Sequence, residues 1–265
     1  MPKIQNFIII HINNCILLLL IVTSPVLSLL IIRQSYICAL SLIILMNESP
    51  HFALSKTPSI ANKFLAELRD PSIQKNRMRF RKNLERIGEI LAYELSKTFV
   101  YQDHQIPTPL GSSATALPSH NPVLVSVLRA GLPLHQGVLN YFDHADSGFI
   151  GAYRRSDEQD QQGFSIQLDY ESMPDIQDRP FILIDPMLAT GRTLVKILQG
   201  ITAYGTPSQI HIVAAIAAPE GIANLEKSGV PFSLWMGAID DHLNSKAYIV
   251  PGLGDAGDLS FGIKK

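Results

Sequence analysis

The sequence predicts an α/β fold with a mainly parallel central sheet flanked by helices. Short, mostly apolar runs at 123–127 and 181–184 are typical of strands that are buried on both faces. Helical patterns alternate with these runs along the chain, as they do in parallel sheets with helices on both faces. Compact turns containing glycine connect run to helix at 129–131 and 189–193.

Bulk composition restricts the classes of function. The 265 residues suffice for one large domain, or for a domain with an appendage. A net charge of −1 provides no electrostatic case for nucleic acid as the main partner. Cys15 and Cys38 both lie near the N-terminus, so the remaining chain has no disulfide framework and no cysteine metal site, which suits the cytoplasm.

The first 45 residues differ in composition from the rest. They contain no Asp or Glu, and the apolar blocks 7–22 and 26–45 are each near membrane-spanning length. Polar residues interrupt both blocks, His11 in the first and Arg33 in the second. The stretch is therefore either a hydrophobic membrane anchor or upstream sequence translated from a misplaced start. We favour a start at Met46, which separates an extension, 1–45, from a domain, 46–265.

The first elements of the domain are predicted to be helical. Residues 58–97 show two helical stretches, separated near Asp70 and Pro71. The second stretch begins within a basic run from Lys75 to Arg86, which we interpret as a solvated helix face or a subunit contact. An RNA-binding strip is the alternative. Residues 101–121 are rich in Pro, Ser and Thr and predict a loop or an edge segment.

The next segment, 122–142, reads as a buried strand, a turn and a helix. Arg129 lies in the turn, where Ala130 and Gly131 leave room for a ligand to approach the backbone. Strands at 148–153 and 164–168 then suggest a hairpin with a long mobile tip. A strand at 209–216, a helix at 219–227 and a strand at 232–236 complete the alternation.

The most informative segment is 181–194, FILIDPMLATGRTL. A strand, a tight turn and a helix N-terminus form an anion site, because free backbone N–H groups and the helix dipole point outward there. Thr190 and Thr193 add hydroxyl donors for phosphate oxygens. Asp185 would repel phosphate, and fits instead a ribose hydroxyl or a ligand-bound magnesium ion. The alternative is an ordinary strand-to-helix connection with Thr190 as the N-cap.

The C-terminal segment 248–262, YIVPGLGDAGDLSFG, predicts a tight loop that presents backbone N–H and C=O groups. Donors and acceptors in a fixed array match the edge of a small planar imide.

Four separated segments resemble the uracil phosphoribosyltransferases. They are FILIDPMLATG, VLRAGL (127–132), AAPEGIANLEKS (217–228) and YIVPGLGDAGD (248–258). Most members of the wider phosphoribosyltransferase group carry two adjacent acids where this chain has Asp185 and then Pro186, as the uracil enzymes do. The resemblance covers about residues 58–262 and implies a phosphoribosyltransferase-like fold, with a small hood built from the N-terminal helices and the C-terminal loop.

The resemblance implies a pyrimidine salvage enzyme. It would transfer the 5-phosphoribosyl group from 5-phospho-α-D-ribose 1-diphosphate (PRPP) to N1 of uracil, giving UMP and diphosphate. The bond from ribose C1 to diphosphate breaks early, so catalysis means neutralising the leaving group and holding the uracil nitrogen in line. The implied cofactor is Mg²⁺, held mainly through PRPP oxygens and water, with no protein ligand assigned.

The family's functional residues carry over onto matching positions. The implied catalytic residues are Arg129, Asp185 and Asp255. The implied PRPP-binding residues are Arg129, Arg154, Asp185, Pro186, Met187, Leu188, Ala189, Thr190, Gly191, Arg192, Thr193 and Asp255. The implied uracil-binding residues are Ile249, Gly254, Asp255 and Ala256. The chain departs from the family pattern at Arg155, where Asn is usual, and at Arg192, where a second glycine is common.

The resemblance also implies partners. These are uracil and PRPP, GTP as an effector, and further copies of the chain in a dimer or larger homo-oligomer. We expect no nucleic acid partner, no membrane if the chain starts at Met46, and a cytoplasmic location. The alternatives are transfer to another base, and an RNA-binding pyrimidine regulator of the same fold.

Overall fold

A computed structural model describes residues 7–12, 15–20, 51–156 and 164–263, with side chains described in 51–153 and 166–263. The chain divides into two compact units, Met1–Glu48 and Ser49–Lys265. In the first unit, β1 (Phe7–Ile12) and β2 (Cys15–Leu20) form an antiparallel pair with Phe7 opposite Leu20. The predicted apolar block 26–45 lies outside the described residues. No helix among the described residues is long and apolar enough to cross a membrane.

The second unit begins with a short strand and the predicted helical region. Its elements up to the second hairpin are β3 (His51–Ala53), η1 (Leu54–Lys56), α2 (Ala61–Arg69), α3 (Arg77–Ser96), β4 (Tyr101–Thr108), β5 (Gly111–Pro118), β6 (Val123–Leu128), α4 (Leu132–Leu139), β7 (Asp146–Ser156) and β8 (Phe164–Ser172). The remaining elements are β9 (Pro180–Ile184), β10 (Met187–Leu188), α5 (Arg192–Gly200), η2 (Ile201–Tyr204), β11 (Gln209–Ala217), α6 (Pro219–Glu226), β12 (Ser233–Ile239), β13 (His242–Leu243), β14 (Ile249–Val250) and α7 (Ala256–Phe261).

A mainly parallel, eight-stranded sheet forms the centre of this unit, which confirms the predicted fold class. Its strand order is β3-β12-β11-β9-β6-β7-β8, and β10 pairs with β11 outside this path. Among the described residues of this sheet, β7 and β8 are the one antiparallel pair, and they form the predicted hairpin. The central strands β6 and β9 are buried almost throughout, because helices cover both faces of the sheet.

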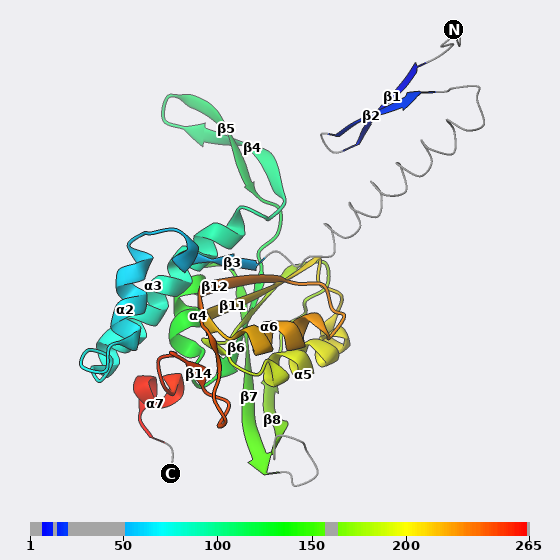
Figure 1. Ribbon diagram of the computed structural model, residues 1–265. Helices are drawn as coiled ribbons and strands as arrows, with labels where there is room; N and C mark the ends of the chain where they lie inside the picture. Colours follow the sequence, from blue (N-terminus) through cyan, green and yellow to red (C-terminus); the bar gives the residue numbers. More distant parts are fainter. Residues whose placement is uncertain (1–6, 13–14, 21–50, 157–163, 264–265) are drawn as a thin grey trace, which may run out of the picture. The chain divides into compact units, whose positions relative to one another are not determined.

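Alternate apolar residues of β6 and β9 enter two separate cores. Leu124 and Ile182 pack under α2, α3 and α4, whereas Val123 and Leu183 pack against α5 on the other face. Figure 1 shows these two groups of helices on opposite sides of the sheet.

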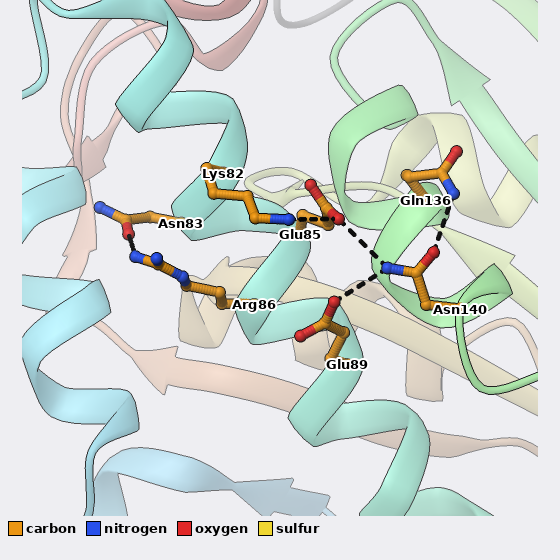
Figure 2. Close-up of polar contacts among 7 residues, drawn as sticks. All are labelled: Lys82, Asn83, Glu85, Arg86, Glu89, Gln136 and Asn140. Carbon is orange, nitrogen blue, oxygen red and sulfur yellow. Dashed lines mark hydrogen bonds and ion pairs between the residues drawn. The ribbon is translucent and has the colours of Figure 1, made fainter.

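Two glycines bring α3 and α4 unusually close together. A Cβ atom on Gly137 would lie 1.9 Å from the carbonyl oxygen of Glu85, and one on Gly88 would lie 2.4 Å from that of Leu134. Beside this contact, the Asn140 amide donates to Glu85 Oε1 at 3.1 Å and to Glu89 Oε1 at 2.8 Å (Figure 2). The two helices therefore form a rigid layer on one face of the sheet.

The predicted hood is present. Helix α3 packs against α7, and the Arg81 guanidinium donates from Nη1 to the carbonyl oxygen of Ser260 at 2.7 Å. The N-terminal helices thereby hold the C-terminal segment at α7, which begins at Ala256, 17 positions after β12 ends at Ile239.

The prediction of a loop or edge segment for 101–121 was wrong. Residues 101–118 form an antiparallel hairpin, β4 and β5, with Tyr101 opposite Pro118. Every residue of both strands is exposed, and Figure 1 shows the hairpin standing apart from the sheet. Because neither face packs on the core, the hairpin has no apolar alternation by which the sequence could reveal it.

Candidate active site

The two predicted anion-binding turns lie side by side at one edge of the sheet. Strands β6 and β9 pair in parallel, with Ser126 beside Ile184, so the turns that follow them meet at the carboxyl edge. A cavity of about 550 Å³ opens there. It is lined by Val127, Leu128, Arg129, Ala130, Ala152, Tyr153, Ile166, Asp185, Met187, Ala189, Thr193, Ala247, Tyr248, Gly254, Asp255, Ala256 and Gly257.

The turn after β9 needs a glycine at one position. Gly191 has a φ of 73°, and a Cβ atom there would lie 2.7 Å from the carbonyl oxygen of Gly221. Gly191, which has no side chain, is also the N-cap of α5, and the Arg192 N–H at the start of the helix donates to Thr190 Oγ1 at 3.5 Å. The alternative placed Thr190 at the N-cap, whereas the structure places Gly191 there and the Thr190 hydroxyl one residue earlier, bonded to the Arg192 N–H. The turn still places the N-terminus of α5, where a helix attracts anions, beside the end of β9.

Asp185 lies at the end of β9 in a partly buried position. Desolvation raises the pKa of its carboxyl group from 3.8 to about 6, although a hydrogen bond from the Met187 N–H, at 3.3 Å, lowers that pKa in part. A carboxyl group with such a pKa becomes fully ionised when hydroxyl donors or a cation approach it. Its surroundings thus suit a ligand that brings hydroxyl groups, a metal ion or both.

Arg129 follows β6 after a cis peptide bond between Leu128 and Arg129. Its Nη2 donates to Asp258 Oδ1 at 2.8 Å and to the carbonyl oxygen of Gly262 at 2.5 Å. Its Nε is buried and has no hydrogen-bond acceptor in the part of the chain that the structure describes. The guanidinium thus retains a donor that an anion in the cavity could use.

The C-terminal segment closes the other side of the cavity. Gly254, with a φ of 92°, is followed by Asp255, whose side chain caps α7 by accepting from the Asp258 N–H at 2.9 Å. Gly254, Asp255 and Ala256 line the cavity, whereas Ile249 does not; Ala256 and Ile249 are both buried in the same core.

Some predicted site residues do not reach the cavity lining. Pro186 is buried, and Leu188 is packed in the core where β10 pairs with β11. Thr190, Gly191 and Arg192 form the turn between two lining residues, Ala189 and Thr193. Arg154 lies near the end of β7, and its side chain, like the predicted mobile tip, lies outside the described residues.

Sequence reasoning missed several residues of the lining. Tyr153 and Tyr248 each directly precede a residue that was predicted to bind, and Ala247 precedes Tyr248. Ala247 has a φ of 59°, a left-handed conformation that is unusual for alanine. The sequence offered one indication that the two tyrosines line the cavity, namely that each is the neighbour of a predicted ligand-binding residue.

The basic run in α3 is largely engaged within the hood. Arg79 pairs with Glu67 at 2.7 Å, Arg81 binds the main chain of Ser260, and Arg86 donates to Asn83 Oδ1 at 3.1 Å. These contacts favour the structural interpretation of the run.

Two strand-to-helix turns that were predicted to bind anions lie with an acid at the carboxyl edge of a parallel sheet, under a hood, and this is the architecture of a phosphoribosyltransferase. The profile of the uracil phosphoribosyltransferase family matches residues 54–263. The chain belongs to the uracil phosphoribosyltransferase family, and it is an enzyme of phosphoribosyl transfer.

Curated relatives support this assignment. The uracil phosphoribosyltransferase of Porphyromonas gingivalis strain ATCC 33277 is 43% identical over 208 residues, which cover 78% of this chain and 95% of the relative. That of Thermococcus gammatolerans is 37% identical over 203 residues, covering 76% of this chain and 88% of the relative. Among solved structures, the AQ2163 protein of Aquifex aeolicus has a TM-score of 0.71 at 29% identity, covering 80% of this chain and 98% of its own.

Proposed function

We propose that the enzyme transfers the 5-phosphoribosyl group of PRPP to N1 of uracil, giving UMP and diphosphate, and that the cavity described above is its active site. The observation that carries the proposal is the convergence of Arg129, Asp185 and the 254–257 loop on one cavity of about 550 Å³. A phosphate-binding turn, a diol-binding acid and a planar-base-binding loop then face one another across it.

The donor occupies the side of the cavity formed by β6, β9 and α5. The turn from Ala189 to Thr193 binds the 5-phosphate through backbone N–H groups at the start of α5 and the threonine hydroxyls. Asp185 accepts hydrogen bonds from the ribose hydroxyls. Arg129 and Arg154 neutralise the leaving diphosphate, and the buried Nε of Arg129 supports this role because it has a free donor.

Uracil occupies the side formed by the C-terminal loop. The main chain at Gly254 and Ala256 matches the donors and acceptors of the imide edge, and Ile249 supports the loop from the core. Asp255 lies between the two substrates, since it lines the cavity while its main chain joins the loop to α7. Holding uracil N1 in line with ribose C1 is the positioning part of catalysis.

Mg²⁺ is the proposed cofactor, and when bound it would offset the negative charge of the leaving diphosphate. The described residues include no group of three or more His, Cys, Asp and Glu that could hold a metal ion. Asp185 and Asp255 both line the cavity, and two carboxylates fit an ion that arrives already bound to donor oxygens.

The decisive assay uses the purified protein with uracil, PRPP and Mg²⁺ and measures UMP formation. Competition with other bases separates a uracil enzyme from one that uses a different base. A folded protein that forms no UMP, or that prefers another base, would contradict the proposal.

We also propose that the enzyme is a homo-oligomer, and the β4–β5 hairpin supports this. A two-stranded hairpin exposed on both faces gains little stability by itself, so a contact with another copy would explain its order. Analytical ultracentrifugation of the protein with and without residues 101–118 tests this, since a monomer in both cases would exclude the role.

GTP as an effector and the cytoplasm as the location are proposals that rest on the family resemblance. Rates measured with and without GTP test the first, and cell fractionation tests the second. Fractionation also tests the proposed start at Met46, together with mass spectrometry of the native N-terminus. A peptide that spans Leu45 and Met46 would exclude that start.

A further inference from the structure

A two-pronged ion pair joins the hood to the end of a sheet strand. Arg69 is the last residue of α2, and Asp240 follows β12 directly. Arg69 Nη2 lies 2.5 Å from Asp240 Oδ1, and Nη1 lies 2.8 Å from Oδ2. The Asp240 side chain is 3% exposed and that of Arg69 is 25% exposed, so the pair is mostly shielded from water.

The same two side chains hold both backbone polar groups of Gly252. Arg69 Nη1 donates to the carbonyl oxygen of Gly252 at 2.9 Å, and the Gly252 N–H donates to Asp240 Oδ2 at 2.8 Å. The guanidinium and the carboxylate thus act together as a clamp on one residue of the C-terminal loop. A planar guanidinium in a paired geometry suits this role, because its donors point in fixed directions.

Gly252 lies at a tight turn of that loop. Its φ is 64°, and a Cβ atom would lie 2.1 Å from the carbonyl oxygen of Ile249. Two residues later, Gly254 begins the stretch that lines the cavity. The position of Gly252 therefore determines how Gly254 and Ala256 present their main-chain groups.

The clamp is itself anchored to the sheet. The Asp240 N–H donates to the carbonyl oxygen of Ala217 at 2.8 Å, and the Asp241 N–H donates to that of Val250 at 2.9 Å. Arg69 is held within the hood, because it belongs to α2 and this helix packs against α3. The loop is thus tied both to the sheet and to the hood.

We propose that Arg69 and Asp240 are positioning residues for the base-binding loop, acting through Gly252, with neither of them touching substrate. The inference rests on the proposed function of residues 249–256 as the uracil site. Neither side chain lines the cavity. A buried ion pair contributes little net stability compared with apolar residues, so its geometry, which matches Gly252 on both sides, accounts for its presence.

The test compares two ion pairs on the same helix. Asp240→Asn keeps an acceptor for the Gly252 N–H but removes the charge that holds Arg69, and Arg69→Lys removes the paired donors. The matched control is Glu67→Gln, since Glu67 on α2 pairs with Arg79 at 2.7 and 2.9 Å without touching the loop. All three variants alter the hood, but only the first two alter the clamp.

Steady-state kinetics provide the readout. We expect Asp240→Asn and Arg69→Lys to raise the KM for uracil about tenfold, as the loss of one charged hydrogen bond predicts, with the KM for PRPP changed less than about twofold. Glu67→Gln should leave both KM values within about twofold, even where it lowers the melting temperature as much as the clamp variants do.

The outcomes are distinguishable. The inference is overturned if the clamp variants leave the KM for uracil unchanged, or if Glu67→Gln raises it equally. Ala256→Val, which adds bulk to the cavity lining, separates this from a failure of the site assignment. If Ala256→Val raises the KM for uracil and the clamp variants do not, the positioning role alone fails. If no variant changes it, the uracil site lies elsewhere.

Discussion

The ionised carboxylate of Asp185 should lower the stability of the ligand-free enzyme, and comparison with the neutral variant Asp185→Asn should show by how much. Desolvation raises the pKa of this carboxyl group from 3.8 to about 6. A difference of roughly two pKa units, at about 1.4 kcal/mol each, corresponds to about 3 kcal/mol. Partial solvent access reduces that figure, so we expect a gain of about 1–3 kcal/mol in the free energy of unfolding of the Asn variant near neutral pH.

The way in which this stability difference depends on pH follows from the linkage between proton binding and folding. Because the folded-state pKa is raised, the folded protein binds this proton more tightly than the unfolded chain does. The stability that protonated Asp185 contributes is present below about pH 4 and is lost as the pH rises through about 6. Asn is neutral throughout. The difference between the two proteins should therefore be near zero at low pH, grow between about pH 4 and 6, and stay constant above.

Urea unfolding of both proteins, without ligand, at a series of pH values measures this difference. Asp185→Ala is the matched control, because it removes the acceptor for the Met187 N–H as well as the charge. It should be less stable than the Asn variant by about 1 kcal/mol. Equal stability of wild type and Asp185→Asn at neutral pH, or a difference independent of pH, would refute the electrostatic argument. The same Asn variant should lose most of its activity with PRPP.

Further predictions concern packing, backbone conformation and proton binding. Gly137→Ala should lower the free energy of unfolding by about 3 kcal/mol, because its Cβ atom would lie 1.9 Å from the Glu85 carbonyl oxygen. Gly200→Ala in α5 is the control: a Cβ atom there has nothing within 4 Å, so the variant should be neutral or slightly stabilising in the same urea titration. Ala247→Gly should raise the free energy of unfolding by about 0.5 kcal/mol, since it relieves a left-handed alanine; a loss of stability in the same urea assay would contradict this. Burial lowers the pKa of His211 to about 4, so the stability that neutral His211 contributes is present above about pH 6.5 and is lost as the pH falls toward 4. In His211→Gln, the free energy of unfolding should therefore decrease less on acidification, by up to about 3 kcal/mol. Calorimetry in buffers of different ionisation enthalpy should show that PRPP binding near pH 6 releases more protons from wild type than from Asp185→Asn.

Much of the fold was predictable because the sheet strands are buried on both faces. Runs such as 181–184 are apolar throughout, and each is followed by a turn and a helical stripe, so local composition identifies both elements. The β4–β5 hairpin was not predictable in this way. Its residues contact neither core, so nothing in their composition distinguishes paired strands from a loop.

The candidate site likewise has features that the local sequence predicts and features that depend on long-range packing. Asp185 and Arg129 could be selected because each lies at a strand-to-helix turn, where parallel strands place functional groups. The partners of Arg129 could not be predicted. Asp258 is 129 residues away in the chain, and the pairing depends on how the hood folds over the sheet.

Local sequence patterns were sufficient to predict the alternation of strands and helices, the positions of the two strand-to-helix turns and the family to which the chain belongs. These features depend on residues that are close together in the chain, where spacing and residue type suffice. Three features became evident from the folded chain alone: Asp185 is desolvated, Arg69 and Asp240 clamp Gly252, and residues 101–118 form a hairpin. Burial and long-range hydrogen bonds arise when distant segments pack together, and no local pattern encodes which segments these are.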